Sequence, residues 1–198
     1  MKAYKPTSAG RRDGTVIEYK KKLTSTKSNP LKSLTAGGRS TGGRNNLGRT
    51  TNLNRGGGNK RTYRLVDFKF DKKDVPARVE TIEYDPYRSG FIALVLYKDG
   101  ERRYILVPQQ VAVGDEIITS AEAKPKAGNR LPLGKIPVGT FIFNIELKPG
   151  AGARIARSAG NYAEVVAQDA GYTLVKLPSS EARKIISTAW APIGAVSN

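Results

Sequence analysis

Residues 91–107 read FIALVLYKDGERRYILV, and this stretch decides the fold. Two β-rich runs flank the step Lys98-Asp99-Gly100-Glu101. An Asp-Gly pair in that setting is a strong signal for a two-residue hairpin. The first run, FIALVLY, is apolar on both faces of an extended chain, which is typical of a strand inside a sheet. The sequence therefore predicts an antiparallel hairpin whose first strand is central.

Similar runs surround the hairpin, and Pro, Gly and Asp separate them. They are TYRLVDFKF (62–70), PARVETIEYD (76–85) and GDEIITS (114–120). Five short antiparallel strands within about 60 residues are typical of a five-stranded barrel of the oligonucleotide-binding type. The predicted fold class is thus mainly β, with this barrel at residues 61–125.

A second β unit is predicted at residues 126–198, as an SH3-like barrel. Residues 121–138 are expected to form a linker and loop. FIFNIELK alternates cleanly, which would place Phe141, Phe143, Ile145 and Leu147 on one face. A turn at Asp169-Ala-Gly171 separates two further runs, and no long helix is expected. Because each barrel is near the size at which a core is marginal, docking together or onto a partner would stabilise both.

The first 60 residues are predicted to be a long, irregular, basic, Gly/Arg-rich extension that penetrates RNA. Only Thr15–Tyr19 suggests a short strand. Residues 35–61 contain eight glycines and six basic residues, with no acid and no aromatic. Such a composition cannot bury enough apolar surface to offset chain entropy, so the segment should be disordered alone. It is interpreted as folding on a polyanion, and a flexible tail is the alternative.

The charge is concentrated in the same region. The chain has a formal charge of +17, and residues 1–64 hold 16 Lys or Arg against Asp13 and Glu18. The remaining residues have 18 basic and 15 acidic side chains, so they are nearly balanced. A polyanionic partner is therefore expected, with nucleic acid first and an anionic membrane second.

The sequence offers little support for a catalytic function. The chain has no Cys and no His, which excludes disulfides, thiol catalysis and the usual general base. No phosphate-binding loop is present, and GAGARI (150–155) lacks the third glycine of a dinucleotide motif. No apolar run is long enough for a transmembrane helix, and no secretory signal is expected. No catalytic or metal-binding residues are predicted, and the protein is not expected to be an enzyme.

Phosphate contacts are predicted at basic residues that lie among glycines or beside aromatics, because Arg offers a planar fork that matches phosphate. For Arg64 and Arg88, a fold-stabilising ion pair is an equal alternative. For Arg102, Arg103, Arg154 and Arg157, the alternative is ordinary solvated charges. The full predicted set is Arg11, Arg12, Arg39, Arg44, Arg49, Arg55, Lys60, Arg61, Arg64, Arg88, Arg102, Arg103, Arg154 and Arg157.

Six motifs occur in order: KPTSAGRR, STGGRNNLGR, RGGGNKRTYRLVDFK, EYDPYRSGFIALVLYKDGERRYIL, IPVGTFIFNIELKPG and ARSAGNY. Together they closely resemble the bacterial form of the universal large-subunit ribosomal protein family number two. The resemblance runs from residue 1 to about residue 196. It implies a primary binder of large-subunit rRNA that supports subunit association and translation. In the family, the arginines that correspond to Arg88 and Arg157 are implicated in RNA binding.

The resemblance also implies partners: large-subunit rRNA, neighbouring ribosomal proteins, and the small subunit at an intersubunit bridge. No cofactor is expected apart from structural Mg²⁺ associated with rRNA. Neither membrane binding nor homo-oligomerisation is expected. The location implied is the cytoplasmic ribosome, with an organellar ribosome as the alternative.

The family's C-terminal extension has no counterpart here, because the chain stops at GAVSN. A natural short form, one half of a split protein and a truncated chain all stay open, and no role near the peptidyl transferase centre is expected of these residues. Two other functions stay open on the residues alone. One is a free-standing single-stranded nucleic-acid binder or RNA chaperone, and the other is a membrane-active polycation.

Overall fold

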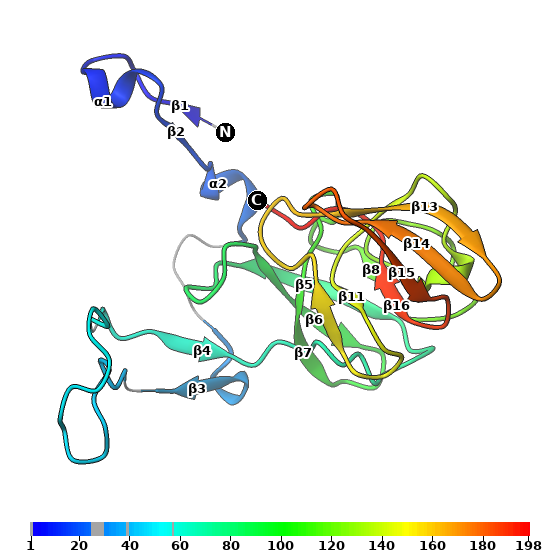
Figure 1. Cartoon of the computed structure of the whole chain (residues 1–198), viewed down its shortest axis with the longest axis horizontal. Coiled ribbons are helices and arrows are strands. Elements are labelled where there is room, and N and C mark those ends of the chain that lie inside the picture. The colour runs from blue at the N-terminus through cyan, green and yellow to red at the C-terminus, as the bar shows by residue number, and fades with distance from the viewer. Residues whose placement is uncertain (1, 25–29, 39, 57) are drawn as a thin grey trace.

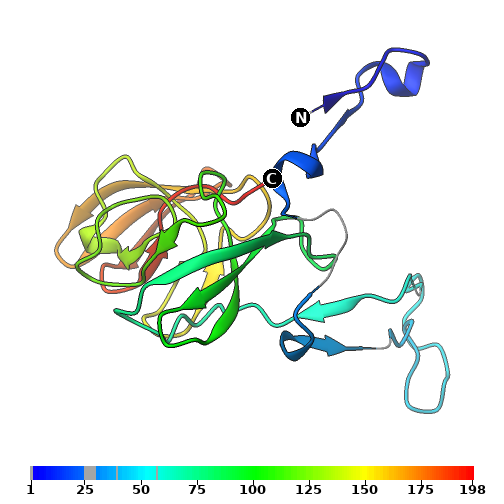
Figure 2. The ribbon, with the colours of Figure 1, turned by 180° about the vertical axis from the view of Figure 1, so that it is seen from behind.

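The computed structural model describes residues 2–24, 30–38, 40–56 and 58–198. Two small β units pack against each other and form the body of the molecule. The N-terminal residues leave this body as two separate projections, one with α1 and the other with β3 and β4 (Figure 1). The view from behind shows the same division (Figure 2).

The first barrel is built on a four-stranded antiparallel sheet in the order β7-β6-β5-β8. Its strands are β5 (Ala77–Glu83), β6 (Ile92–Tyr97), β7 (Arg102–Leu106) and β8 (Glu116–Ile117). The predicted hairpin is confirmed as β6–β7, and β6 is an inner strand, as its two apolar faces require. The side chains of β6 that face the core pack on Val79, Phe91 and Ile105.

The hairpin loop differs from the prediction in length. The Gly100 N–H donates to the Tyr97 carbonyl, and the Tyr97 N–H donates to the Glu101 carbonyl, both at 2.9 Å. The loop therefore has three residues, and Gly100 takes the left-handed conformation with φ 88°. A type I turn followed by a left-handed glycine matches the twist of the strands as well as a two-residue turn does.

The run TYRLVDFKF does not add a full strand to this sheet. Its first part is β4 (Thr62–Arg64), which pairs with β3 (Thr35–Gly37). The chain then reaches the sheet edge, where Val66 bridges to Tyr104 in parallel. The Asp67 N–H donates to the Tyr104 carbonyl at 2.8 Å. This contact closes the side of the first barrel beyond β7.

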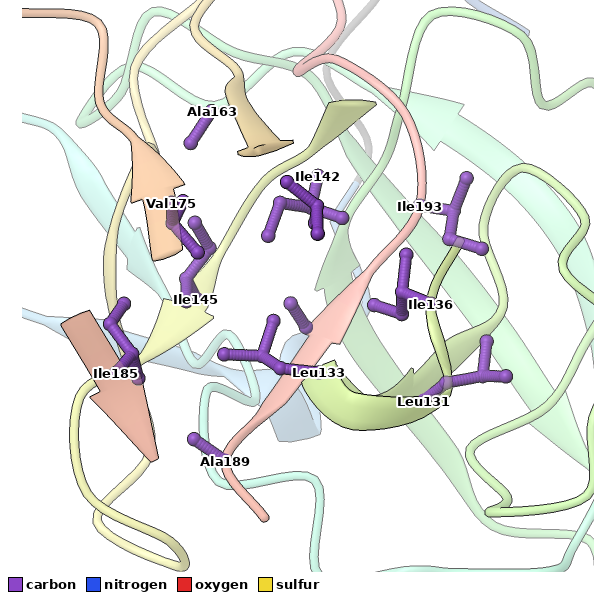
Figure 3. Close-up of a cluster of buried hydrophobic side chains, with 12 residues drawn as sticks. Leu131, Leu133, Ile136, Ile142, Ile145, Ala163, Val175, Ile185, Ala189 and Ile193 are labelled. Atoms are coloured by element: carbon purple, nitrogen blue, oxygen red, sulfur yellow. The ribbon is translucent and has the colours of Figure 1, made fainter. Parts of the chain in front are cut away.

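The second barrel has a four-stranded sheet in the order β10-β13-β14-β15 and two strand pairs, β9–β16 and β11–β12. Figure 3 shows its core, in which apolar side chains from most of these elements converge. The Ala170-Gly171 turn between β13 and β14 has positive φ at both residues, 42° and 80°. The strands are β9 (Arg130–Pro132), β10 (Phe141–Ile142), β11 (Ile145–Glu146), β12 (Ala153–Ile155), β13 (Ala163–Asp169), β14 (Tyr172–Lys176), β15 (Ala182–Ile186) and β16 (Trp190–Pro192).

Two expectations for this region are wrong. FIFNIELK is not one strand, because Asn144 has φ 47° and interrupts the pleat between β10 and β11. Asn tolerates this conformation better than most residues. Phe141 is 47% exposed, while Phe143 and Ile145 are buried, so these side chains do not share one face.

The expected linker at 121–138 is also more than a linker. It contains β9 and the 3₁₀ helix η2 (Leu133–Lys135). Leu131, Leu133 and Ile136 belong to the core of the second barrel. These apolar residues are interspersed with Pro and Gly, so their pattern does not predict a buried element. Their burial arises from contacts with distant strands.

In the described ranges, the elements of the N-terminal projections are short: β1 (Lys2–Ala3), α1 (Ala9–Arg12), β2 (Thr15–Val16), α2 (Tyr19–Lys22), η1 (Lys32–Leu34), β3 and β4. The strand expected at Thr15–Tyr19 therefore covers only two residues. The Leu31 N–H donates to the Tyr104 hydroxyl at 2.9 Å, and Leu31 and Leu34 pack on the first barrel. Dependence of this region's order on RNA stays a prediction. None of the helices in the described ranges has the length and apolar character needed to cross a bilayer.

A buried ion pair of the second barrel also contacts the first barrel. Arg130 of β9 contacts Glu146 of β11 at 2.7 Å, with side chains 2% and 3% exposed. The guanidinium also lies over the ring of Phe70 from the first barrel, 4.2 Å from its centroid. Burial lowers the pKa of Arg130 to about 10, and Glu146 opposes that shift, so the arginine stays charged at neutral pH.

The end of the chain makes a second connection between the barrels. The Ser197 N–H donates to the Val107 carbonyl, and the Phe91 N–H donates to the Ser197 hydroxyl, both at 3.0 Å. Val196 is fully buried against Gly90, where a Cβ would lie 2.7 Å from a Val196 methyl. The two barrels therefore form one body.

We expect Glu146→Gln to lower the free energy of unfolding by about 3–5 kcal/mol, because it leaves the Arg130 charge buried without a counter-charge. The measurement is guanidinium denaturation followed by the fluorescence of Trp190. Glu122→Gln is the control, since Glu122 is exposed, and it should change stability by less than about 0.5 kcal/mol. Equal stability of the two variants would show that the buried pair is dispensable.

Candidate nucleic-acid interface

A turn at Asp67–Phe70 organises the candidate site. One carboxylate oxygen of Asp67 accepts hydrogen bonds from the Lys69 and Phe70 N–H groups, both at 2.9 Å. Phe70 has φ 50°, and its ring is buried over Arg130. Phe68, in the same turn, is partly exposed. The turn thus contributes one aromatic ring to the junction and another to the surface.

Arg88 and Arg157 meet on the ring of Phe68. Their guanidinium carbons lie 5.5 Å and 4.5 Å from its centroid. Arg88 follows β5 in the first barrel and Arg157 follows β12 in the second. The Ala153 N–H also donates to the Phe68 carbonyl at 2.8 Å, which ties β12 to the turn. The structure therefore brings together, across the barrel junction, the two arginines that the resemblance singles out.

Asp85 fixes the position of Arg88. Its side chain is fully buried, and one oxygen contacts Arg88 Nε at 2.5 Å. The other oxygen accepts the Tyr87 N–H at 2.9 Å. The sequence predicts either an ion pair or a phosphate contact for Arg88. The ion pair is present, and the 15% exposure of the Arg88 side chain leaves part of it accessible to a ligand.

The basic segment joins the body close to this site. Arg61 Nη1 donates to the Pro86 carbonyl at 3.1 Å, and the Tyr87 hydroxyl donates to the Arg61 carbonyl at 3.4 Å. The rings of Tyr63 and Tyr87 meet edge to face with centroids 5.3 Å apart. These contacts place the end of the basic segment beside Pro86 and Tyr87, one or two residues from Arg88.

Most other predicted contacts are exposed on the projections. Arg11 lies 5.0 Å from the ring centroid of Tyr4, and Arg44 Nη1 donates to the Gly48 carbonyl at 3.1 Å. The loop that carries Arg44 and Arg49 needs Gly43, because a Cβ there would lie 2.3 Å from the Asn52 carbonyl. Arg39 lies outside the described residues. The exposed members of the set are Arg11, Arg12, Arg44, Arg49, Arg55, Lys60, Arg61, Arg154 and Arg157.

Three residues of the predicted set make contacts within the protein. Arg64 is 2% exposed, and its Nη1 donates to the Thr62 carbonyl at 2.8 Å. Arg102 makes a bidentate ion pair with Glu80, with N–O distances of 2.7 and 3.0 Å. Arg103 contacts the carboxylates of Asp67, Asp71 and Glu101. The structure favours a fold-stabilising role for Arg102 and Arg103, because acidic side chains already pair with their guanidinium groups, and for Arg64, because it is buried.

Arg103 has a particular structural role, since its contact with Asp67, at 2.8 Å, supports the turn that carries Phe68. Its hydrogen bond also lowers the pKa of the Asp71 carboxyl below the ordinary value, against a smaller effect of burial. Because the pKa of Asp71 is lower in the folded protein, the Arg103–Asp71 pair stabilises the fold fully at pH values above the ordinary carboxyl pKa. This stabilisation is lost as the pH falls through the lowered value.

Sequence analysis missed Phe68, although the available signal was an aromatic residue within the basic run from Arg61 to Lys69. What the sequence could not show is that residues 68, 88 and 157 converge. No group of three or more acidic residues suited to a metal ion occurs in the part of the chain that the structure describes. The site is therefore a set of oriented cations on an aromatic ring, which suits a polyanionic ligand.

We expect Arg103→Gln to raise the pKa of Asp71 toward the ordinary value of about 3.9, because it removes the hydrogen bond that stabilises the carboxylate. NMR titration of the carboxyl carbons measures this directly. Arg102→Gln is the matched control: it should raise the pKa of Glu80, which Arg102 lowers, and leave Asp71 unchanged. An unaltered Asp71 titration in Arg103→Gln would contradict the assignment of the pair.

Comparison with known proteins gives a consistent result over the whole chain. Residues 31–119 match the family described as "Ribosomal Proteins L2, RNA binding N-terminal domain". Residues 126–198 match "Ribosomal Proteins L2, C-terminal domain". Large ribosomal subunit protein uL2 of Granulibacter bethesdensis is 55% identical over 198 residues, which is all of this chain and 71% of that protein. The uL2 of a Ruegeria species is 54% identical, over all of this chain and 70% of that protein.

Proposed function

Because the chain belongs to the uL2 family of large-subunit ribosomal proteins, we propose that it anchors large-subunit rRNA through Arg88, Phe68 and Arg157. It is a structural protein of the large ribosomal subunit, with an RNA-binding N-terminal domain. The observation that carries the site proposal is the convergence of two arginines, one from each barrel, on one aromatic ring.

The proposed mechanism begins with orientation. Stacking on Phe68 restricts the two guanidinium planes, and Asp85 restricts Arg88 further. A planar fork that is already positioned loses less freedom when it binds phosphate. Because the arginines come from different barrels, the spacing between them depends on the junction that Arg130 and Glu146 stabilise. The rRNA would thus be read by its backbone geometry at this point.

The second part of the mechanism is charge neutralisation. The exposed cations of residues 1–64 replace counterions around closely packed phosphates, and the glycines between them allow close approach of the backbone. Arg11, Arg12, Arg44, Arg49, Arg55, Lys60, Arg61 and Arg154 are the residues proposed for this role. Arg39 is proposed with them on its sequence context alone.

We also propose a role for each segment of the chain and a place for the protein in the ribosome. Residues 1–60 serve as the RNA-penetrating segment, and residues 61–125 and 126–198 as the two barrels that position it. The protein acts as a monomer in the cytoplasmic ribosome, beside neighbouring ribosomal proteins and at a bridge to the small subunit. It performs no catalysis, and the only ions involved are structural Mg²⁺ ions of the rRNA.

We expect the protein to sediment with large ribosomal subunits and to remain there after a high-salt wash, because multiple packed phosphate contacts do not exchange readily. The measurement is immunodetection across a sucrose gradient. A small-subunit protein and a soluble RNA chaperone provide the reference positions. Migration at the top of the gradient would favour a free-standing nucleic-acid binder and contradict the proposal.

We expect Arg88→Ala and Arg157→Ala each to weaken binding to large-subunit rRNA and to reduce the salt slope by about 1. If six to ten phosphates are contacted, log affinity of the unaltered protein should fall with log salt at a slope of roughly −5 to −9. Filter binding at several salt concentrations measures both quantities.

The control for these variants is Arg183→Ala, which removes one exposed charge on β15 outside the proposed interface. It should leave the affinity within about twofold, since a single distant charge is largely screened. Equal losses in Arg183→Ala and Arg157→Ala would reject the site and leave only a general effect of net charge.

A further inference from the structure

Two aromatic side chains lie together on the outer face of the second barrel. Phe141 of β10 and Tyr162, directly before β13, have ring centroids 4.5 Å apart and an interplanar angle of 50°. Their residues are 47% and 44% exposed. Aromatic side chains are the most effective groups for burial, so an exposed pair in contact marks a surface suited to a ligand.

The pair borders a surface cavity of about 430 Å³ that we name the aromatic pocket. This volume lies within the usual range for small-ligand sites, so it can accommodate one nucleotide. Its chemistry is mixed, with two aromatic faces, one cation and several acceptors. The residues that define it are Phe141, Asn161, Tyr162, Glu164, Lys176 and Ser180.

The polar groups of the pocket have complementary functions. Glu164 and Lys176 are opposite each other on β13 and β14. A lysine ammonium donates hydrogen bonds to phosphate or to base acceptors, and a glutamate accepts them from the exocyclic amino groups of bases. Asn161 can do both. An aromatic face with donors and acceptors beside it is the arrangement by which proteins bind unstacked bases.

The pocket lies close to Arg157 along the chain. Asn161 and Tyr162 follow Arg157 in one loop, and hydrogen bonds fix that loop. The Gly160 N–H donates to the Val196 carbonyl at 3.1 Å, and the Val196 N–H donates to the Asn161 carbonyl at 3.0 Å. An RNA strand that contacts Arg157 can therefore follow the loop into the pocket.

We propose that the aromatic pocket binds one unpaired base of large-subunit rRNA, stacked on Phe141 and Tyr162. This inference rests on the proposed function and names a second contact of the same ligand. RNA is favoured over a protein partner because Asn161 and Tyr162, which line the pocket, lie on the loop that carries the exposed Arg157. Stacking is tolerant of sequence and adds affinity without neutralising charge.

The test uses the full chain and naked large-subunit rRNA, at a salt concentration where binding is moderate. We expect Phe141→Ala and Tyr162→Ala each to weaken binding about tenfold, which is within the usual range for loss of one stacked base. The salt slope should stay unchanged, because no phosphate contact is lost. Phe141→Trp should retain the affinity, since it keeps an aromatic face.

Tyr172→Ala is the matched control, because Tyr172 is a 52% exposed aromatic residue on the same sheet and does not line the pocket. It should bind as the unaltered protein does. Circular dichroism melting checks each fold. If Phe141→Ala does not fold, Phe141→Leu replaces it, as leucine keeps apolar bulk and lacks a π face.

A second measurement locates the contact. Photo-crosslinking with rRNA that contains 4-thiouridine, followed by mass spectrometry, should label Phe141 or Tyr162 in the unaltered protein. The pocket assignment is overturned if neither residue is labelled and both alanine variants bind normally. In that case a loss in Arg157→Ala would still support the proposed function, whereas failure of the unaltered protein to bind rRNA would reject both.

A protein partner is the remaining outcome. It would appear as normal binding of the Phe141 and Tyr162 alanine variants to naked rRNA, together with poor incorporation into large subunits. That result would also overturn the proposal.

Discussion

The buried ion pair between Arg130 and Glu146 is the contact on which the arrangement of this molecule depends. Two charges at 2.7 Å in an almost inaccessible site tolerate little displacement, because separating them leaves each without solvation. The pair spans two strands of the second barrel, and the Arg130 guanidinium rests on Phe70 of the first. Phe70 belongs to the Asp67 turn, and the same turn presents Phe68 to Arg88 and Arg157. The buried pair and the surface site therefore share one structural support.

Arginine has two separate uses in this chain. In the body, acidic side chains surround Arg102 and Arg103, so these residues contribute to the fold and little to the external field. In the described part of the projections acids are scarce, and the arginines other than Arg64 face solvent. The division explains how a molecule with charge +17 keeps a compact body: most of the excess charge lies where the chain is extended and repulsion is weak.

Aromatic residues complement the charges at the proposed RNA contacts. Phosphate binding through counterion release is strong but depends on salt and carries little sequence information. Phe68 adds orientation to Arg88 and Arg157, and the Phe141–Tyr162 pair would add stacking that salt hardly affects. Combining the two kinds of contact would let a small protein bind strongly and still place one segment of RNA accurately.

The sequence alone determined the mainly β fold, the hairpin at Asp99-Gly100 with its central strand, and the polycationic segment, because turn chemistry, apolar patterning and composition are local properties. The motifs also identified the family. Only the tertiary structure decided which arginines face solvent and which pair with acids. Arg103 meets Asp67 and Asp71, which lie more than thirty residues earlier, while Arg88 and Arg157 meet on Phe68. It also decided that Asn144 interrupts FIFNIELK and that Phe141 is exposed. These outcomes depend on which distant strands pack together, and spacing along the chain does not encode that packing.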